Sequence, residues 1–103
     1  MKEKDGNKTV LSGVPATLPA LIKAFRVQEK TSNVGFDWDN PADVWAKVKE
    51  EINEVEQEIT SGNATDLEKE FGDLLFSIVN VARTYGVNPE NALEKTNQKF
   101  INR

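Results

Sequence analysis

The segment from Phe71 to Ala82, FGDLLFSIVNVA, constrains the fold of this chain more than any other part of the sequence. At helical periodicity it is apolar almost all round, which is typical of a helix that is buried on more than one side. The polar residue directly before this segment and three polar residues within it form one line along the helix axis, because they are spaced by three, four and three residues. They are Glu70, Asp73, Ser77 and Asn80. Carboxylates on a buried helix need a cation or another partner.

A second acidic segment precedes this helix, and the turn-forming sequence Ser61-Gly62-Asn63 separates the two. At about 100° per residue, the apolar residues between positions 44 and 59 form one core-facing stripe, and the acids begin at its edge. The stripe consists of Val44, Trp45, Val48, Ile52, Val55 and Ile59. Two helices that fold back at the turn would bring the two acidic clusters face to face. These clusters are Glu50, Glu51 and Glu54 on one side and Glu70 and Asp73 on the other.

Two interpretations of these clusters are open. A solvated helix face is the ordinary explanation for a run such as EEINEVEQE. A divalent-metal site is favoured when both clusters are considered together, because few lysines are close enough in sequence to neutralise them. The chain has no His and no Cys, so the ligands would be hard oxygens, which favour Mg²⁺ or Mn²⁺. Mg²⁺ in such sites commonly also binds substrate phosphates, so we expect a catalytic site.

The length of 103 residues and the apolar content of 38% predict a single domain, near the size at which oligomerisation often helps. We expect an all-α fold, an antiparallel bundle of about four helices that is completed by dimerisation. Residues 1–16 read as a polar tail or linker, and residues 17–103 as the domain. The net charge of −4 argues against nucleic-acid binding. We expect the N-terminal MKEKDGNK to be neither a signal peptide nor a membrane anchor, and no apolar run could span a membrane. The absence of Cys excludes a disulfide scaffold and is compatible with the cytosol, so we expect a cytoplasmic protein.

Turn and cap residues predict where the helices begin and end. The first should run from Thr17 to about Lys30, and the second from Pro41 or Ala42 to about Thr60, with Gly62 as its C-terminal cap. The third should start at a Thr65 or Asp66 cap and end near Tyr85, and the fourth should follow Asn88 and Pro89, with Leu93 and Phe100 facing the core. In the loop before the second helix, Phe36 and Trp38 fit packing better than stacking on a nucleobase.

A basic row, Lys95, Lys99 and Arg103, repeats at intervals of four residues on the last helix. Cations near a helix C-terminus also favour the helix dipole, so the row has an ordinary explanation. The functional alternative is a clamp for phosphate, with Arg83 as a further candidate.

The combination EExxE and ExxD resembles the MazG-type nucleoside triphosphate pyrophosphohydrolases of the all-α NTP pyrophosphatase superfamily. The segments LPALIKAFRVQEK, VGFDW, EFGDLLFSIVNVAR and NALEKTNQKFINR are similar to the family in the same order, over about residues 14–103. The resemblance implies hydrolysis of a (deoxy)nucleoside triphosphate to the monophosphate and pyrophosphate, with water attacking the α-phosphate. It implies Glu51, Glu54, Glu70 and Asp73 as Mg²⁺ ligands and Glu50 as the residue that orients or deprotonates the water. It implies phosphate contacts from Lys47, Lys99 and Arg103, with Asn97 in the same segment.

Other hypotheses stay open on the sequence. One is a non-catalytic helical module that dimerises and in which the acids only solvate the surface. Others are more specialised relatives that act on dUTP, dCTP or phosphoribosyl-ATP. Members of the family usually continue beyond the position of Arg103 and often carry two such domains, so the chain is also consistent with a fragment of a longer protein.

Overall fold

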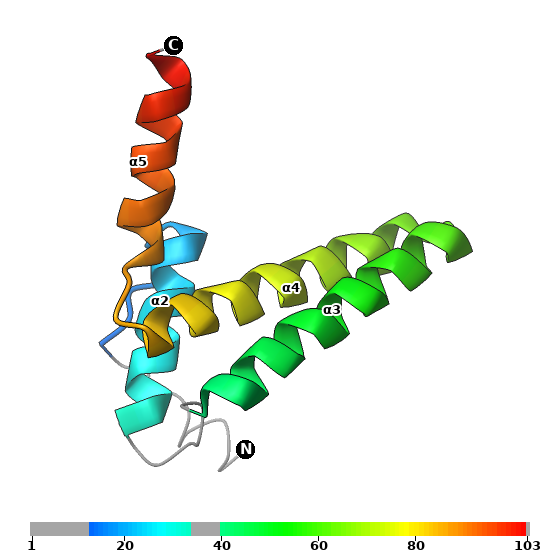
Figure 1. The fold of residues 1–103 in the computed structure, drawn as a ribbon, viewed down its shortest axis with the longest axis horizontal. Helices are drawn as coiled ribbons and strands as arrows, with labels where there is room; N and C mark the ends of the chain where they lie inside the picture. The colour runs from blue at the N-terminus through cyan, green and yellow to red at the C-terminus, as the bar shows by residue number, and fades with distance from the viewer. Residues whose placement is uncertain (1–12, 34–39, 103) are drawn as a thin grey trace.

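The computed structural model describes residues 13–33 and 40–102, and the regular elements in these ranges are all α-helices. Helix α2 spans Ala20–Asn33, α3 spans Pro41–Ser61, α4 spans Ala64–Thr84 and α5 spans Pro89–Ile101. The predicted all-α class is therefore confirmed. Figure 1 shows α3 and α4 as a long antiparallel hairpin, with α2 packed across the end of α4 and α5 projecting away from the hairpin. Among the described residues, no helix is both long enough and apolar enough to cross a bilayer.

Two capping residues fix the turn of the hairpin. Gly62 ends α3 at a φ of 81°, a conformation that side chains disfavour, and its N–H donates to the Glu58 carbonyl at 3.0 Å. The side chain of Asn63 then accepts a hydrogen bond from the N–H of Asp66 at 3.0 Å. The prediction of Gly62 as a cap is confirmed. The prediction of Thr65 or Asp66 as the next cap is wrong, because α4 starts directly after Asn63.

The remaining helix starts show one agreement and one difference. Asn88 caps α5 as predicted, with its side chain accepting from the N–H of Asn91 at 3.1 Å. Helix α2 begins at Ala20 rather than near Thr17, because the carbonyl of Pro19 accepts the first helical hydrogen bond. The loop aromatics Phe36 and Trp38 and residues 1–12 of the predicted tail lie outside the described residues.

The core of the hairpin is a small apolar cluster. Val44 and Val48 of α3 pack with Val81 of α4, and Leu74 covers the cluster. Helix α2 contacts this unit through the fully buried Gln28, whose Nε2 atom donates to the carbonyl of Phe76 at 2.9 Å. The α3–α4 hairpin thus carries the acidic residues of both clusters.

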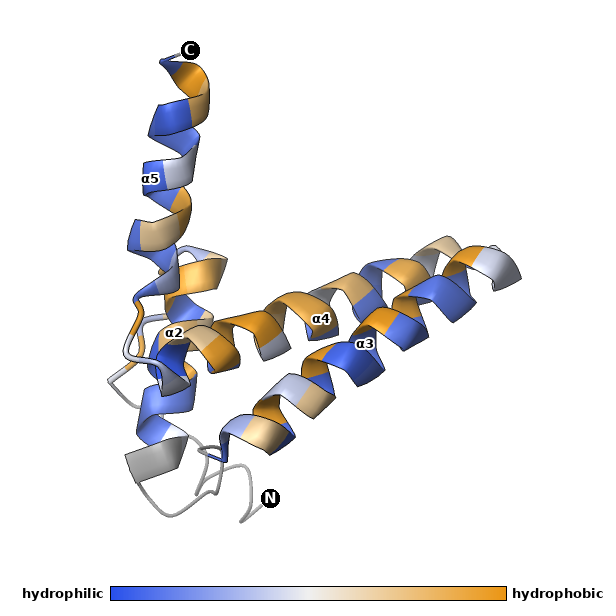
Figure 2. Cartoon of the chain, viewed as in Figure 1, coloured by the Kyte–Doolittle hydropathy of each residue, from blue (hydrophilic) through white to orange (hydrophobic). Residues whose placement is uncertain are grey.

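Much of the predicted apolar stripe is not covered within one chain. Trp45, Ile52 and Ile59 of α3 are 43–58% exposed, although the sequence predicted them to face the core. Leu93 and Phe100, also predicted to be buried, are 51% and 75% exposed, and α5 has no buried residue. Figure 2 shows hydrophobic residues along much of α4 and at intervals on α5. Helix α2 covers only one end of the hairpin, so these apolar side chains are exposed in the single chain. The dimerisation expected from the sequence stays a prediction.

Candidate active site

Three carboxylates from the two helices of the hairpin converge. Glu51 of α3 and Glu70 and Asp73 of α4 have carboxylate oxygens that all lie within 4.8 Å of one another. Glu51 is only 7% exposed, Glu70 is half-buried and Asp73 is exposed. The antiparallel turn at Gly62 brings the two acidic clusters together at these residues, so the two clusters do meet as the sequence suggested. Their role as metal ligands remains a prediction.

The other two predicted acids lie beside this group. Glu54, one turn beyond Glu51, is half-buried and stands outside the set of three. Its negative charge nevertheless contributes to raising the pKa of Glu70. The Glu50 side chain is 59% exposed, and its Oε2 atom is 3.6 Å from the Nζ atom of Lys47. Glu50 is therefore open to solvent next to the most buried carboxylate of the group.

The electrostatics of the group favour a bound cation. Partial desolvation raises the pKa of Glu70 above its ordinary value of 4.5, and the negative charges of Asp73, Glu54 and Glu51 raise it further. Lys69 offsets a part of this effect. Mutual repulsion of this kind is relieved when a cation lies among the oxygens.

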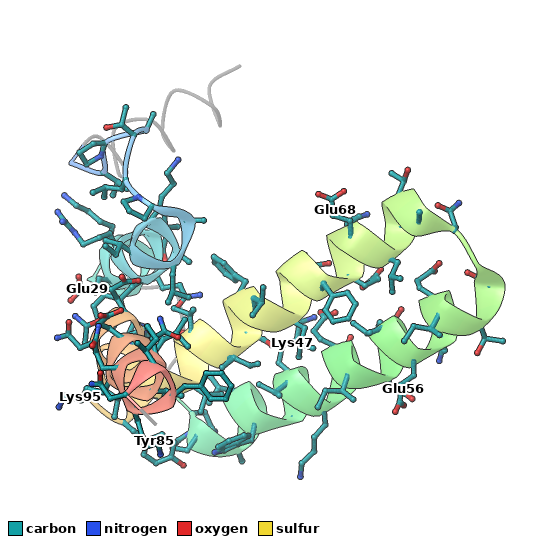
Figure 3. All side chains as sticks on the ribbon, turned by 90° about the horizontal axis from the view of Figure 1, so that it is seen from above. Glu29, Lys47, Glu56, Glu68, Tyr85 and Lys95 are labelled. Carbon is teal, nitrogen blue, oxygen red and sulfur yellow. The ribbon has the colours of Figure 1, made fainter. Side chains whose placement is uncertain are left out.

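Among the described residues, Lys47 makes the closest ion pair with these carboxylates. Its Nζ atom is 3.0 Å from the Oε2 atom of Glu51, and this hydrogen bond raises the pKa of Lys47 above its ordinary value of 10.5, with a smaller contribution from Glu50. Figure 3 shows Lys47 on the side of α3 that faces α4, whereas Glu56 and Glu68 point away from the hairpin. The three converging carboxylates thus differ in position from Glu56 and Glu68, which lie on the outer faces of the same helices.

A pocket of about 390 Å³ lies beside the carboxylates, between α3 and α4. The polar line predicted along α4 forms one wall of it, because Asp73, Ser77 and Asn80 all line the pocket. The sequence placed Ser77 and Asn80 on this line but gave them no role. Their helical register with Asp73 was the signal that could have assigned them to the site. The full lining consists of Asp43, Val44, Lys47, Glu51, Asp73, Phe76, Ser77 and Asn80.

Arg83, which the sequence suggested as a further phosphate contact, binds Asn80. Its Nε and Nη2 atoms donate to the Oδ1 atom of Asn80 at 3.2 and 3.0 Å. Asn80 is 7% exposed and Arg83 is half-buried, so this contact is partly shielded from solvent.

The predicted phosphate-binding residues of α5 are not brought to the carboxylates within one chain. The C-terminal half of α5, which carries Asn97 and Lys99, projects away from the hairpin in Figure 1. The Nδ2 atom of Asn97 donates instead to Glu94 of its own helix at 3.4 Å. Arg103 lies outside the described residues.

Comparison with known proteins bears directly on this geometry. Residues 40–103 match the family described as the MazG nucleotide pyrophosphohydrolase domain, so the match includes both acidic clusters. The chain is 45% identical, over 103 residues and 99% of its length, to the "nucleoside triphosphate pyrophosphohydrolase/pyrophosphatase MazG" of Thermotoga maritima. It is 45% identical, over 97 residues and 92% of its length, to the "nucleoside triphosphate pyrophosphohydrolase" of Escherichia coli K12. It is also 46% identical over 103 residues to the protein YabN of Bacillus subtilis.

The relatives are longer than this chain. The chain spans 39% of the T. maritima protein, 37% of the E. coli protein and 21% of YabN. The family match nevertheless covers well over half of the chain, and it agrees with the resemblance seen in the sequence motifs. The chain therefore belongs to the MazG nucleotide pyrophosphohydrolase family.

Proposed function

We propose that this chain hydrolyses (deoxy)nucleoside triphosphates to the monophosphate and pyrophosphate in a reaction that depends on Mg²⁺, with water attacking the α-phosphate. The observation that carries the proposal is the convergence of Glu51, Glu70 and Asp73 beside a pocket in a chain of the MazG family. The names of the T. maritima and E. coli relatives support the substrate class. We assign the activity to residues 17–103 and to the cytoplasm, where nucleoside triphosphates are abundant.

The residues present fit a hard divalent cation. Glu51, Glu70 and Asp73 offer oxygens within 4.8 Å of one another, and Glu54 is close enough to raise the pKa of Glu70. With no His or Cys in the chain, Mg²⁺ or Mn²⁺ suits this donor set better than zinc or copper. When bound, the cation would polarise the α-phosphate and offset the charge that develops on the pyrophosphate leaving group.

Glu50 is the residue that we assign to the attacking water. It would orient the water and accept its proton while the water oxygen bonds to the α-phosphorus. The bond from the α-phosphorus to the oxygen that bridges to the β-phosphorus breaks, and pyrophosphate leaves with that oxygen. The Glu50 side chain is exposed, and Glu50 directly precedes Glu51 in the sequence, which supports this role. The Nζ atom of Lys47 lies 3.6 Å from the Oε2 atom of Glu50 and restricts the motion of this carboxylate.

The β- and γ-phosphates need cations, and we assign Lys47, Lys99 and Arg103 to them, with Asn97 beside them. Lys47 is already at the carboxylates, whereas α5 is directed away from them within one chain. We therefore propose a homodimer or a higher homo-oligomer, in which the α5 helix of a second copy completes the site. The exposed apolar residues of α3, α4 and α5 support such an assembly.

The direct test is pyrophosphate release from a panel of canonical and noncanonical NTPs and dNTPs, with dUTP, dCTP and phosphoribosyl-ATP included. Each reaction is run with Mg²⁺ and with EDTA. We expect release that requires the metal, and the range of substrates would distinguish a broad enzyme from a specialised one. A folded, dimeric protein that releases no pyrophosphate from any substrate would refute the proposal and favour the non-catalytic module.

A further inference from the structure

Asn80 holds its side-chain amide in one orientation at the wall of the pocket. Its Oδ1 atom accepts two hydrogen bonds from Arg83, at 3.2 Å from Nε and 3.0 Å from Nη2. A guanidinium group only donates, so the atom that faces it must be the amide oxygen. The amide nitrogen consequently points away from Arg83, and no acceptor among the described residues is bonded to it. Asn80 is 7% exposed and lines the pocket, so the pocket contains a fixed and available N–H donor.

The position of Asn80 along α4 separates it from the phosphate chemistry. With a helical rise of about 1.5 Å per residue, Asn80 lies about 10 Å from Asp73 along the helix axis, and Ser77 lies about 6 Å from Asp73. In a nucleoside triphosphate whose α-phosphate is at the carboxylates, the sugar follows one ester linkage later and the base beyond it. The sugar and the base are thus the parts of the substrate that can extend as far as Asn80.

The lining of the pocket around Asn80 suits a neutral group better than a phosphate. On α4, the pocket-lining residues nearest to Asn80 in the sequence are Phe76 and Ser77, and Val44 lines the pocket from α3. The Oγ atom of Ser77 donates to the carbonyl of Leu74 at 2.7 Å, so the hydroxyl offers lone pairs to a ligand and no proton. Lys47 also lines the pocket, but its Nζ atom is 3.0 Å from the Oε2 atom of Glu51. Two N–H groups of Arg83 are directed at Asn80. Asp43, in the same lining, would repel a phosphate.

We propose that Asn80 is a specificity-determining residue, which donates a hydrogen bond from Nδ2 to an acceptor on the nucleoside part of the substrate. Arg83 is a positioning residue that fixes the direction of this donor. The acceptor is either the sugar 3′ oxygen or a carbonyl or ring nitrogen of the base. A donor of fixed direction on a largely buried residue discriminates strongly, because a bound substrate without a matching acceptor covers it and leaves it unpaired. This inference rests on the proposed function.

Calorimetric titration of the full chain separates the nucleoside contact from the phosphate contacts. The two probes are a non-hydrolysable α,β-imido nucleoside triphosphate and inorganic tripolyphosphate, each with Mg²⁺. Asn80→Asp keeps the shape and the contact with Arg83 but removes the donor, and Asn80→Leu removes it without adding charge. We expect both variants to bind the nucleotide analogue about tenfold more weakly or worse. We expect tripolyphosphate to bind Asn80→Leu within about twofold of the wild type, because this ligand has no nucleoside.

Arg83→Leu should reproduce this pattern, since it frees the amide to rotate. In an Asn80→Leu background the same change should have little further effect on nucleotide affinity, because the donor is already absent. If Arg83→Leu instead weakens tripolyphosphate as much as the nucleotide, Arg83 binds phosphate directly and its positioning role is wrong. Circular dichroism and thermal melting establish that each variant is folded.

The outcomes distinguish this inference from the proposed function. A wild-type protein that binds neither probe contradicts the proposed function itself. A wild-type protein that binds the nucleotide analogue, together with Asn80 variants that bind it equally well, overturns only the role of Asn80. An analogue without the 3′ hydroxyl then identifies the acceptor: the loss in Asn80→Leu disappears if the donor binds the sugar and persists if it binds the base.

Discussion

The Nζ atom of Lys47 lies 3.0 Å from the Oε2 atom of Glu51, so the most buried carboxylate of the site is paired with a lysine from one turn earlier on the same helix. The pair places a positive charge at the edge of a group of acids that repel one another. A divalent cation bound by Glu51 would take over the neutralisation of this carboxylate. Lys47 would then be available to bind a phosphate of the substrate.

Replacement of Lys47 by Met should destabilise the metal-free protein by about 1–2 kcal/mol, because it leaves the buried Glu51 carboxylate without its partner. Added Mg²⁺ should raise the melting temperature of this variant more than that of the wild type, since the metal neutralises the same carboxylate. Thermal melts with EDTA and with Mg²⁺ measure both effects. Lys49→Met is the matched control, as Lys49 is exposed on the same helix. Equal losses in the two variants would show that the Lys47–Glu51 pair has no special importance.

Replacement of Asp73 by Asn should reduce pyrophosphate release by about 100-fold or more, because it removes the charge of one of three converging carboxylates. The metal-free protein should melt at an equal or higher temperature, since repulsion with Glu70 decreases. The increase in melting temperature on adding Mg²⁺ should become smaller. Glu68→Gln, on the outer side of α4, is the control and should retain activity. Full turnover by Asp73→Asn would refute the assignment of the site.

The raised pKa of Glu70 predicts how the stability of the metal-free protein depends on pH. The folded state holds the Glu70 proton more tightly than the unfolded state, so its stability should decrease as the pH rises through the region just above 4.5. Melting temperatures in EDTA, measured from pH 4.5 to about pH 7 for the wild type and Glu70→Gln, test the sign. The variant should show a flatter dependence, because it has no proton to lose. A dependence that is unchanged in Glu70→Gln would assign the effect to other groups.

The affinity for Mg²⁺ should change in the same pH range for a related reason. Protons and the metal compete for the Glu70 carboxylate, so Mg²⁺ should bind more weakly as the pH falls toward 4.5. Calorimetry in two buffers of different ionisation enthalpy should detect protons released on binding. Metal binding without proton release at pH 5 to 6 would contradict a role for Glu70 as a ligand.

The sequence predicted the hairpin well because its signals are local. The turn glycine Gly62, the cap Asn88 and the apolar periodicity each act within a few residues, so they require no knowledge of the tertiary structure. The convergence of Glu51 with Asp73 follows from the same local information once the two helices are taken as antiparallel. The start of α4 was misplaced because Asn63 and Asp66 are both good capping residues, and only the position of the turn decides between them.

Burial was harder to predict than secondary structure. Periodicity identifies the apolar side of a helix, but not whether another helix covers it, so Ile52 and Leu93 were expected in the core and are exposed in the single chain. The contact between Arg83 and Asn80 was missed because both residues are on one helix, where an arginine near the C-terminus already has an ordinary explanation. Residues of α5 were assigned to the phosphates from the spacing of the basic row and from the family resemblance, and the single chain does not bring them to the carboxylates.

The exposed apolar face of α4 predicts the assembly. Phe71, Leu75 and Ile78 are 45%, 56% and 45% exposed and share one side of the helix, a larger patch than isolated surface residues form. The wild type should therefore elute with at least twice the chain mass of 11.5 kDa in light scattering, and Leu75→Glu should shift it toward the monomer. Glu68→Lys, on an exposed part of α4, is the control. A wild type that is monomeric at all concentrations would refute the proposed dimer.

Complementation between two inactive variants tests whether the site is shared. Asp73→Asn removes a carboxylate of the hairpin, and Lys99→Ala removes a cation of α5, which projects away from that hairpin. If the α5 helix of a second copy completes each site, a heterodimer of the two variants has one site in which both residues are intact. Random exchange of equal amounts gives half heterodimers with one of two sites restored, so about one quarter of the wild-type activity should return. If Lys99 instead serves the site of its own chain, both sites of the heterodimer are damaged and the mixture stays inactive.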